Sequence, residues 1–146
     1  MKISEGPIIL NYRLPANIEQ VWNALTNHEI MIQWFFPNIP DFKPEVGFKT
    51  QFVIENEGRV FTHDWKILVV SKNEYIVYHW RYPEYSGDSN LTFNLESKGN
   101  ETTVTVRVDI LEDYPDEIPE FKLESCVGGW NYFIGESLLN FLQDTK

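Results

Sequence analysis

Three residues of the types used in acid–base catalysis and metal binding, His63, Asp64 and His79, lie near the middle of the chain. They fall in segments where apolar and polar residues alternate, as is typical of β-strands. Because successive side chains of a strand point to opposite faces, Asp64 points away from His63. His79 likewise lies on the face opposite to Tyr78 and Trp80. No third ligand stands at a spacing that suits a metal ion, so the pattern favours hydrogen-bonded histidines in a sheet over a catalytic or metal site.

The positions expected for the three residues His63, His28 and Cys126 give no further indication of a catalytic site. His63 shares its predicted strand face with Phe61 and Trp65, so it is expected to point inward. His28, near the start of a short predicted helix, is expected to be exposed. Cys126 is the single cysteine, which excludes an internal disulfide. It lies beside an apolar helical stripe and is interpreted as a small buried hydrophobe.

Charged residues gather at the predicted strand ends and before the last helix. Arg59 with Glu57, and Arg81 with Glu84, could contact the polar end of a ligand. Solvated charges are the favoured interpretation, because charged side chains are seldom buried. The acidic, proline-containing segment 109–120 lacks the spacing of a calcium loop and is interpreted as a solvated connector.

Aromatic residues make up 15% of the chain and recur in most of its predicted elements. These rings could wall a ligand cavity, or they could fill the core, and the sequence leaves both interpretations open. In the first case, His63 or Tyr78 would fix a polar end of the ligand. The candidates for the cavity wall are Trp34, Phe35, Phe48, Phe61, His63, Trp65, Tyr78, Trp80 and Trp130.

The periodicity of the sequence predicts the elements that position these side chains. Alternation over residues 7–14 predicts a strand. Asn17, with Gln20 three residues later, predicts a helix that begins with a capping box. Asn27 can cap a second, short helix that ends at about Trp34.

From Gly47 onward the period of the pattern is two residues, and turn signals separate five further strands. These strands are predicted at residues 48–54, 60–70, 75–82, 91–95 and 102–111. A long helix is predicted from about Pro119 toward Gln143, and Gly128 and Gly129 within it predict a close approach to the sheet or a local bend. The apolar stripe of this helix comprises Leu123, Val127, Trp130, Ile134, Leu138 and Phe141.

Length and charge limit the function. The 146 residues fit one domain, and the net charge of −10 argues against nucleic-acid binding and against docking on an anionic membrane. No signal peptide and no apolar run of membrane-spanning length is visible, so a cytoplasmic protein is expected. No nucleophile–base pair or phosphate-binding loop is visible either. We therefore expect no cofactor, and an enzyme is not the leading interpretation.

Six sequence blocks, taken in order, resemble the START-like (SRPBCC, Bet v 1-like) superfamily, and within it the Hsp90 ATPase activator homologue 1-like family. The resemblance implies one domain over residues 1–146 with an α+β helix-grip fold, in which a curved antiparallel sheet wraps around a long C-terminal helix. Residues 43–47 depart from the family pattern, because they contain one glycine and no arginine. The matching blocks are residues 21–27, 33–35, 46–48, 78–80, 101–104 and 128–130.

The resemblance and the aromatic pattern together predict non-enzymatic binding of a small apolar, aromatic or lipid-like ligand between the sheet and the last helix. One alternative is an Hsp90-type co-chaperone or another protein-interaction module. A second alternative is a cyclase-, dehydratase- or hydrolase-like enzyme that works in the cavity. The superfamily makes a monomer or a homodimer the expected assembly.

Overall fold

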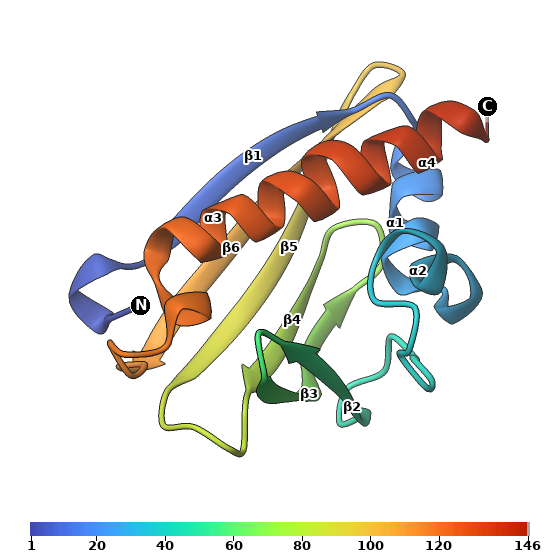
Figure 1. Cartoon of the computed structure of the whole chain (residues 1–146). Helices are drawn as coiled ribbons and strands as arrows, with labels where there is room; N and C mark the ends of the chain where they lie inside the picture. The colour runs from blue at the N-terminus through green and yellow to red at the C-terminus, as the bar shows by residue number, and fades with distance from the viewer. Residues whose placement is uncertain (146) are drawn as a thin grey trace.

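Six antiparallel strands form one sheet in the order β1-β6-β5-β4-β3-β2, and the computed structural model describes residues 1–145. The first strand pairs with the last, while the other neighbours are hairpins of consecutive strands (Figure 1). The order of one strand, two helices, five strands and a helix agrees with the prediction. The strands are β1 Ile8–Leu14, β2 Lys49–Asn56, β3 Arg59–Ser71, β4 Tyr75–Arg81, β5 Asp88–Lys98 and β6 Glu101–Glu112.

Helices occupy two places in this order. Two short helices follow β1, and a long C-terminal helix crosses the concave face of the curved sheet (Figure 1). The long helix consists of two α-helical parts with a π-helical segment between them. The bounds are η1 Ile3–Glu5, α1 Ile18–Thr26, α2 His28–Trp34, η2 Pro119–Phe121, α3 Leu123–Tyr132, η3 Phe133–Leu138 and α4 Leu139–Asp144.

The start of the long helix differs from the prediction. Pro119 opens only a 3-10 turn, and Lys122 then adopts an extended backbone with φ −77° and ψ 152°. The α-helix therefore begins at Leu123, because an extended residue interrupts the pattern of helical hydrogen bonds.

The apolar stripe of the long helix also shifts near its end. Trp130, Ile134 and Leu138 are buried as predicted, but Leu142 is buried in the place expected for Phe141, which is only partly buried. The π-helical segment explains the shift, because its i→i+5 hydrogen bonds place more residues in each turn than an α-helix does.

The predicted caps of the first two helices are confirmed. The Asn17 side chain accepts a hydrogen bond from the Gln20 backbone N–H at 2.9 Å, and the Gln20 side chain accepts from the Asn17 N–H at 3.2 Å. Asn27 accepts from the Glu29 N–H at 3.0 Å. These bonds satisfy N–H groups that a helix start otherwise leaves unpaired.

Of the two alternatives predicted at Gly128 and Gly129, a close approach to the sheet or a local bend, the close approach is wrong. A Cβ atom built at either glycine would meet no heavy atom within 4 Å, and the helix continues through both residues. The close approach occurs instead at Gly135, where a Cβ would lie 3.4 Å from the ring of Tyr12 on β1.

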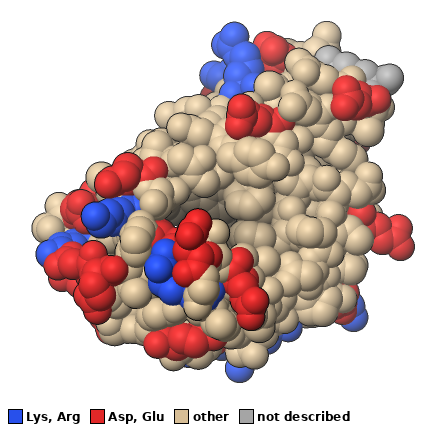
Figure 2. Space-filling view, in the orientation of Figure 1, with Lys and Arg blue, Asp and Glu red and all other residues tan. Residues whose placement is uncertain are grey.

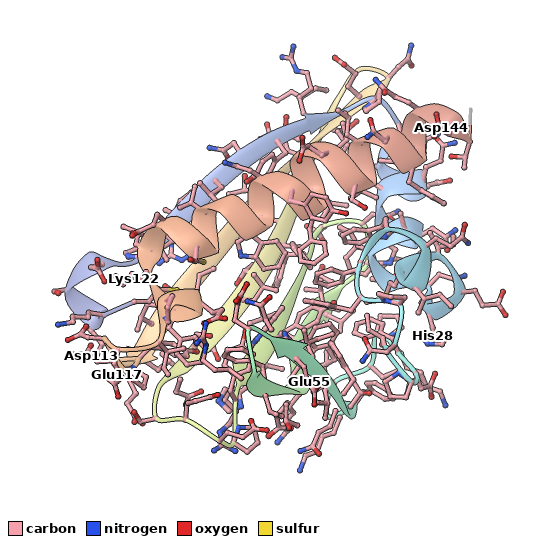
Figure 3. The ribbon with its side chains drawn as sticks, viewed as in Figure 1. His28, Glu55, Asp113, Glu117, Lys122 and Asp144 are labelled. Carbon is pink, nitrogen blue, oxygen red and sulfur yellow. The ribbon has the colours of Figure 1, made fainter. Side chains whose placement is uncertain are left out.

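The acidic connector is shorter and less solvated than expected. Residues 109–112 belong to β6, and the Asp113 carboxylate accepts a hydrogen bond from the Ile3 N–H at 2.7 Å. Tyr114 is only 3% exposed, so the connector contributes to the core. Asp113 and Glu117 lie at the edge of the molecule, away from the crowded rings under the long helix (Figure 3).

Among residues 1–145, none of the helices combines the length and the apolar character that crossing a membrane requires.

Replacing Asn17 by alanine removes the acceptor for the Gln20 N–H and should lower the free energy of unfolding by about 1 kcal/mol. Denaturant unfolding followed by tryptophan fluorescence would measure the change. Asn23→Ala, at an exposed position of the same helix, is the matched control and should not destabilise the protein. Equal destabilisation by both substitutions would contradict the role of the cap.

Candidate functional site

A cavity of about 160 Å³ lies between the sheet and the first half of the long helix. Its sheet side is formed by His63 of β3, Trp80 of β4, Ser89 and Leu91 of β5, and Val108 of β6. The face of the molecule seen in Figure 2 is hollowed below the helix, and charged side chains gather beside the hollow. The cavity therefore occupies the wedge between the curved sheet and the helix.

Small residues on the helix leave this space unfilled. Ser125, Cys126 and Gly129 line the cavity on successive turns of α3. A Cβ atom at Gly129 would meet nothing within 4 Å, so the glycine borders open space. The next lining residues, Trp130 and Phe133, are large and close the cavity toward the second half of the helix.

Trp130 holds the helix above the sheet. Its ring centroid lies 5.6 Å from that of Phe93 on β5, 5.9 Å from that of Trp80 on β4 and 6.0 Å from that of Phe35. Such edge-on and tilted ring contacts stabilise beyond the area that they bury. The ring therefore sets the distance between the helix and the sheet at this end of the cavity.

His63 is the most buried polar side chain of the cavity wall apart from the hydroxyls, with 5% of its surface exposed. Its ring stacks on Phe52 at a centroid distance of 4.8 Å, and Tyr82 meets it edge-on at 5.0 Å. Burial lowers the pKa of His63 to about 4, although a hydrogen bond to the Phe61 carbonyl and the charge of Glu84 act in the opposite direction. The imidazole is therefore neutral at pH 7.

Two hydroxyl groups of the wall hydrogen-bond to each other. Tyr114 donates to the Ser89 oxygen at 3.1 Å, and Ser89 donates to the Trp80 carbonyl at 3.0 Å. The Tyr114 ring lies on Gly87, where a Cβ would come within 2.5 Å of it and where φ is +111°. Glycine is required here by both the conformation and the contact. Burial raises the pKa of Tyr114 to about 12, so its hydroxyl stays protonated.

The nucleophilic group of the cavity is also neutral. Burial raises the pKa of the Cys126 thiol to about 11, so the thiolate needed for nucleophilic attack is scarce at pH 7. A histidine with a pKa of about 4 is in turn a weak general base. Neither group is therefore in the protonation state that acid–base or thiolate chemistry at pH 7 requires.

One ion pair lies at the mouth of the cavity. Glu120, which lines the cavity, accepts two hydrogen bonds from Arg59 at 2.8 and 2.9 Å and one from Asn56 at 2.7 Å. The bond from Arg59 holds the pKa of Glu120 below its usual value. Arg59 was expected to be solvated, but this pair ties the β2–β3 hairpin to η2 beside the cavity.

The structure divides the nine predicted wall residues into two groups. His63, Trp80 and Trp130 line the cavity. The other six residues do not line the cavity, and their rings pack against neighbouring rings, as in the stacked Trp34–Phe35 pair with centroids 4.8 Å apart. The Tyr78 hydroxyl is buried without a hydrogen-bond partner among the described residues, away from the cavity. Outside the cavity wall lie Trp34, Phe35, Phe48, Phe61, Trp65 and Tyr78.

Several wall residues were not predicted from the sequence. The spacing of Ser125, Cys126 and Gly129 places them on one face of α3, and this spacing was the signal for a cavity. From the sequence, Gly128 and Gly129 were instead interpreted as a close approach to the sheet or a bend. Tyr114 was assigned to a solvated connector, and its position in the wall depends on the fold of that connector. The unpredicted wall residues are Met1, Phe36, Tyr82, Ser89, Leu91, Val108, Tyr114, Glu120, Phe121, Ser125, Cys126, Gly129 and Phe133.

The predicted outer face of the sheet is confirmed. Asp64 points away from His63 and pairs with Arg81 at 3.4 Å. His79 lies 2.5 Å from the Asp88 carboxylate, with 29% of its side chain exposed. Within residues 1–145, no group of three or more histidine, cysteine, aspartate or glutamate side chains could hold a metal ion.

The expectation that His28 is exposed is wrong. It is partly buried, and its Nε2 lies 2.6 Å from the Ile39 carbonyl oxygen. The loop after α2 folds back over the start of that helix, which the spacing of the sequence does not show.

The fold and the cavity together define an α+β helix-grip domain with a partly enclosed, mostly apolar cavity under its long helix. The family model described as Activator of Hsp90 ATPase homolog 1-like protein (AHSA1) matches residues 15–143. The chain belongs to this family, as the resemblance predicted. No curated protein matches the sequence at a significant level.

Solved structures share the fold at low sequence identity. Protein CV1439 from Chromobacterium violaceum has a TM-score of 0.76 and 21% identity over 95% of this chain and 98% of its own. Protein MLL2253 from Mesorhizobium loti has a TM-score of 0.73 and 23% identity over 97% and 99%. DynU16, from the dynemicin biosynthetic locus, has a TM-score of 0.72 and 21% identity over 95% of this chain, which spans only 48% of DynU16.

The pKa of His63 should make the stability of the fold depend on pH. In the unfolded chain the imidazole binds a proton below its ordinary pKa of 6.5, whereas in the folded protein it does so only near pH 4. Between these values the unfolded state binds more protons, so the free energy of unfolding should fall as the pH falls. The decrease should reach about 3 kcal/mol, and denaturant unfolding across this pH range would measure it. An unchanged pH dependence in His63→Phe would contradict the assignment.

Proposed function

We propose that this chain binds a small, uncharged, mostly apolar molecule in the cavity between the sheet and α3, without acting on it chemically. The observation that carries the proposal is the cavity of about 160 Å³ in a core that is otherwise packed with aromatic and aliphatic side chains. Protein interiors are normally close-packed, and an apolar space of about 150 Å³ can admit a benzene-sized molecule. The ligand would therefore be about the size of one substituted aromatic ring.

The chemistry of the wall supports an uncharged ligand. Trp80, Trp130 and Phe133 offer apolar surface, while His63 and Cys126 carry no charge at pH 7. Few polar groups in a mostly apolar, concave site are typical of small-molecule sites. The weak base and the protonated thiol favour binding over the enzymatic alternative, since neither is tuned for proton transfer or attack.

Gly129→Leu places a side chain in the open space beside α3 and should weaken the binding of toluene at least about tenfold, because the leucine occupies the ligand volume. Ligand-observed NMR and quenching of tryptophan fluorescence would measure the affinity. Leucine has a higher helix propensity than glycine, so the variant should remain folded.

Gly128→Leu is the matched control. Gly128 is exposed, precedes Gly129 in the same helix and does not line the cavity. Its substitution should leave toluene binding unchanged. Absence of toluene binding to the wild-type protein, or equal loss in both variants, would overturn the proposal.

Binding to an Hsp90-type chaperone is a second candidate, and the description of the matching family is the observation that favours it. A partner would need an exposed apolar contact, and Tyr132 on α3, with 55% of its surface exposed, offers one. This candidate predicts binding that calorimetry detects with the wild-type chain and that Tyr132→Ala weakens. Absence of heat at high micromolar concentrations of both proteins would count against it.

A further inference from the structure

We infer that the cavity selects ring compounds that carry a hydrogen-bond donor, such as a phenolic or alcoholic hydroxyl, and that this donor binds Nε2 of His63. The inference rests on the proposed function, since it names the class of ligand that the same cavity holds. It distinguishes a hydroxylated ring from a hydrocarbon or an ether of similar size.

The contact of Nδ1 fixes where the proton of the imidazole lies. Nδ1 of His63 is 3.2 Å from the backbone carbonyl oxygen of Phe61. A carbonyl oxygen can only accept a hydrogen bond, so Nδ1 carries the proton and donates it. In a neutral imidazole the other nitrogen then has a free lone pair. Since burial keeps the ring neutral, Nε2 is a hydrogen-bond acceptor.

No described residue uses this acceptor. Among residues 1–145, no side chain or backbone group forms a hydrogen bond with Nε2 of His63. Four rings flank the imidazole: Phe36 and Phe52 have no polar hydrogen, and neither Trp80 nor Tyr82 forms a hydrogen bond with Nε2. Because Nδ1 faces its own strand, Nε2 lies on the other side of the ring and is the nitrogen left for the cavity, which His63 lines. Nε2 is not one of the fully buried atoms without a partner, so it is accessible from the cavity and open to a hydrogen-bond donor on a ligand.

The other uncharged polar groups of the wall each carry a proton, so none of them is restricted to accepting a hydrogen bond as Nε2 is. The hydroxyls of Ser89 and Tyr114 are joined to each other and to the Trp80 carbonyl. Burial raises the pKa of Tyr82 and of Cys126, so both keep their protons. A ligand hydroxyl could therefore donate to His63 while its oxygen accepts from one of these protonated groups.

Charged ligands fit the cavity poorly. Among residues 1–145, Glu120 is the only charged side chain in the wall, and its oxygens are occupied by Arg59 and Asn56. The α-ammonium of Met1, which also lines the cavity, already donates to the Phe121 carbonyl and lies 3.9 Å from the Glu5 carboxylate. An anion such as a carboxylate or a phenolate would therefore lack a free cation and would face the lone pair of Nε2. Because an unpaired buried charge is costly, the selected form is the neutral hydroxyl.

The test compares three probes of similar size: phenol, which donates a hydrogen bond, anisole, which only accepts one, and toluene, which does neither. In the wild-type protein and in His63→Phe, the affinities for all three are measured by NMR titration. The ratio of phenol to toluene affinity should fall about five- to tenfold in His63→Phe, which corresponds to the loss of one hydrogen bond. Toluene affinity itself should change little. His79→Gln, on the opposite face of the sheet, should leave every ratio unchanged.

A second measurement uses the wild-type protein alone and so does not depend on the folding of the variant. Long-range proton–nitrogen NMR spectra of His63 should show a protonated Nδ1 and an unprotonated Nε2. Phenol, but not anisole, should shift the Nε2 resonance in the direction of hydrogen bonding.

The outcomes separate the two proposals. If none of the probes binds the wild-type protein, the proposed function fails. If all bind but the ratio does not depend on His63, the ligand class inferred here fails while the cavity remains a binding site. A proton on Nε2, or an Nε2 resonance that phenol does not shift, would also overturn the inference.

Discussion

The contact of Trp130 with rings on the sheet and on the loop after α2 sets how the long helix covers the concave face. Beyond this ring, Ile134, Leu138 and Leu142 are buried in the hydrophobic core. Before it, small residues leave the sheet uncovered, so the space opens only on one side of Trp130. One large ring beside three small residues therefore produces both a stable helix–sheet interface and a cavity within it.

The cavity combines an apolar wall with a polar group held neutral by that wall. Desolvation by the surrounding rings is what keeps the imidazole of His63 uncharged, and the backbone of its own strand decides which nitrogen carries the proton. The same rings that make the site hydrophobic thus give its histidine one defined hydrogen-bonding role. Hydrophobic burial and polar specificity are not separate features here, since the first determines the second.

The sequence predicted the fold well because the fold depends on local patterns. Alternation separated His63 from Asp64, and the Asn17 cap was visible from the spacing of two residues. The cavity wall was predicted only in part, because alternation shows which face of the sheet a side chain lies on but not which positions along the strand border the cavity. Phe61 and Trp65 lie on the same face of β3 as His63, yet of these three residues only His63 lines the cavity. The packing of the Tyr114 ring on Gly87 brings together residues that are distant in the chain, and no local sequence pattern predicts this contact.

The π-helical segment Phe133–Leu138 affects how this chain can be compared with its relatives. A turn closed by i→i+5 bonds contains one more residue than an α-helical turn, so the segment acts as an insertion inside a helix that looks continuous. Against a relative with an uninterrupted helix, an ungapped alignment would be correct before Phe133 and one residue out of step after it. Equivalent positions around Leu142 therefore have to be assigned from superposed backbones, and identities of 21–23% provide too few matched residues to reveal the offset.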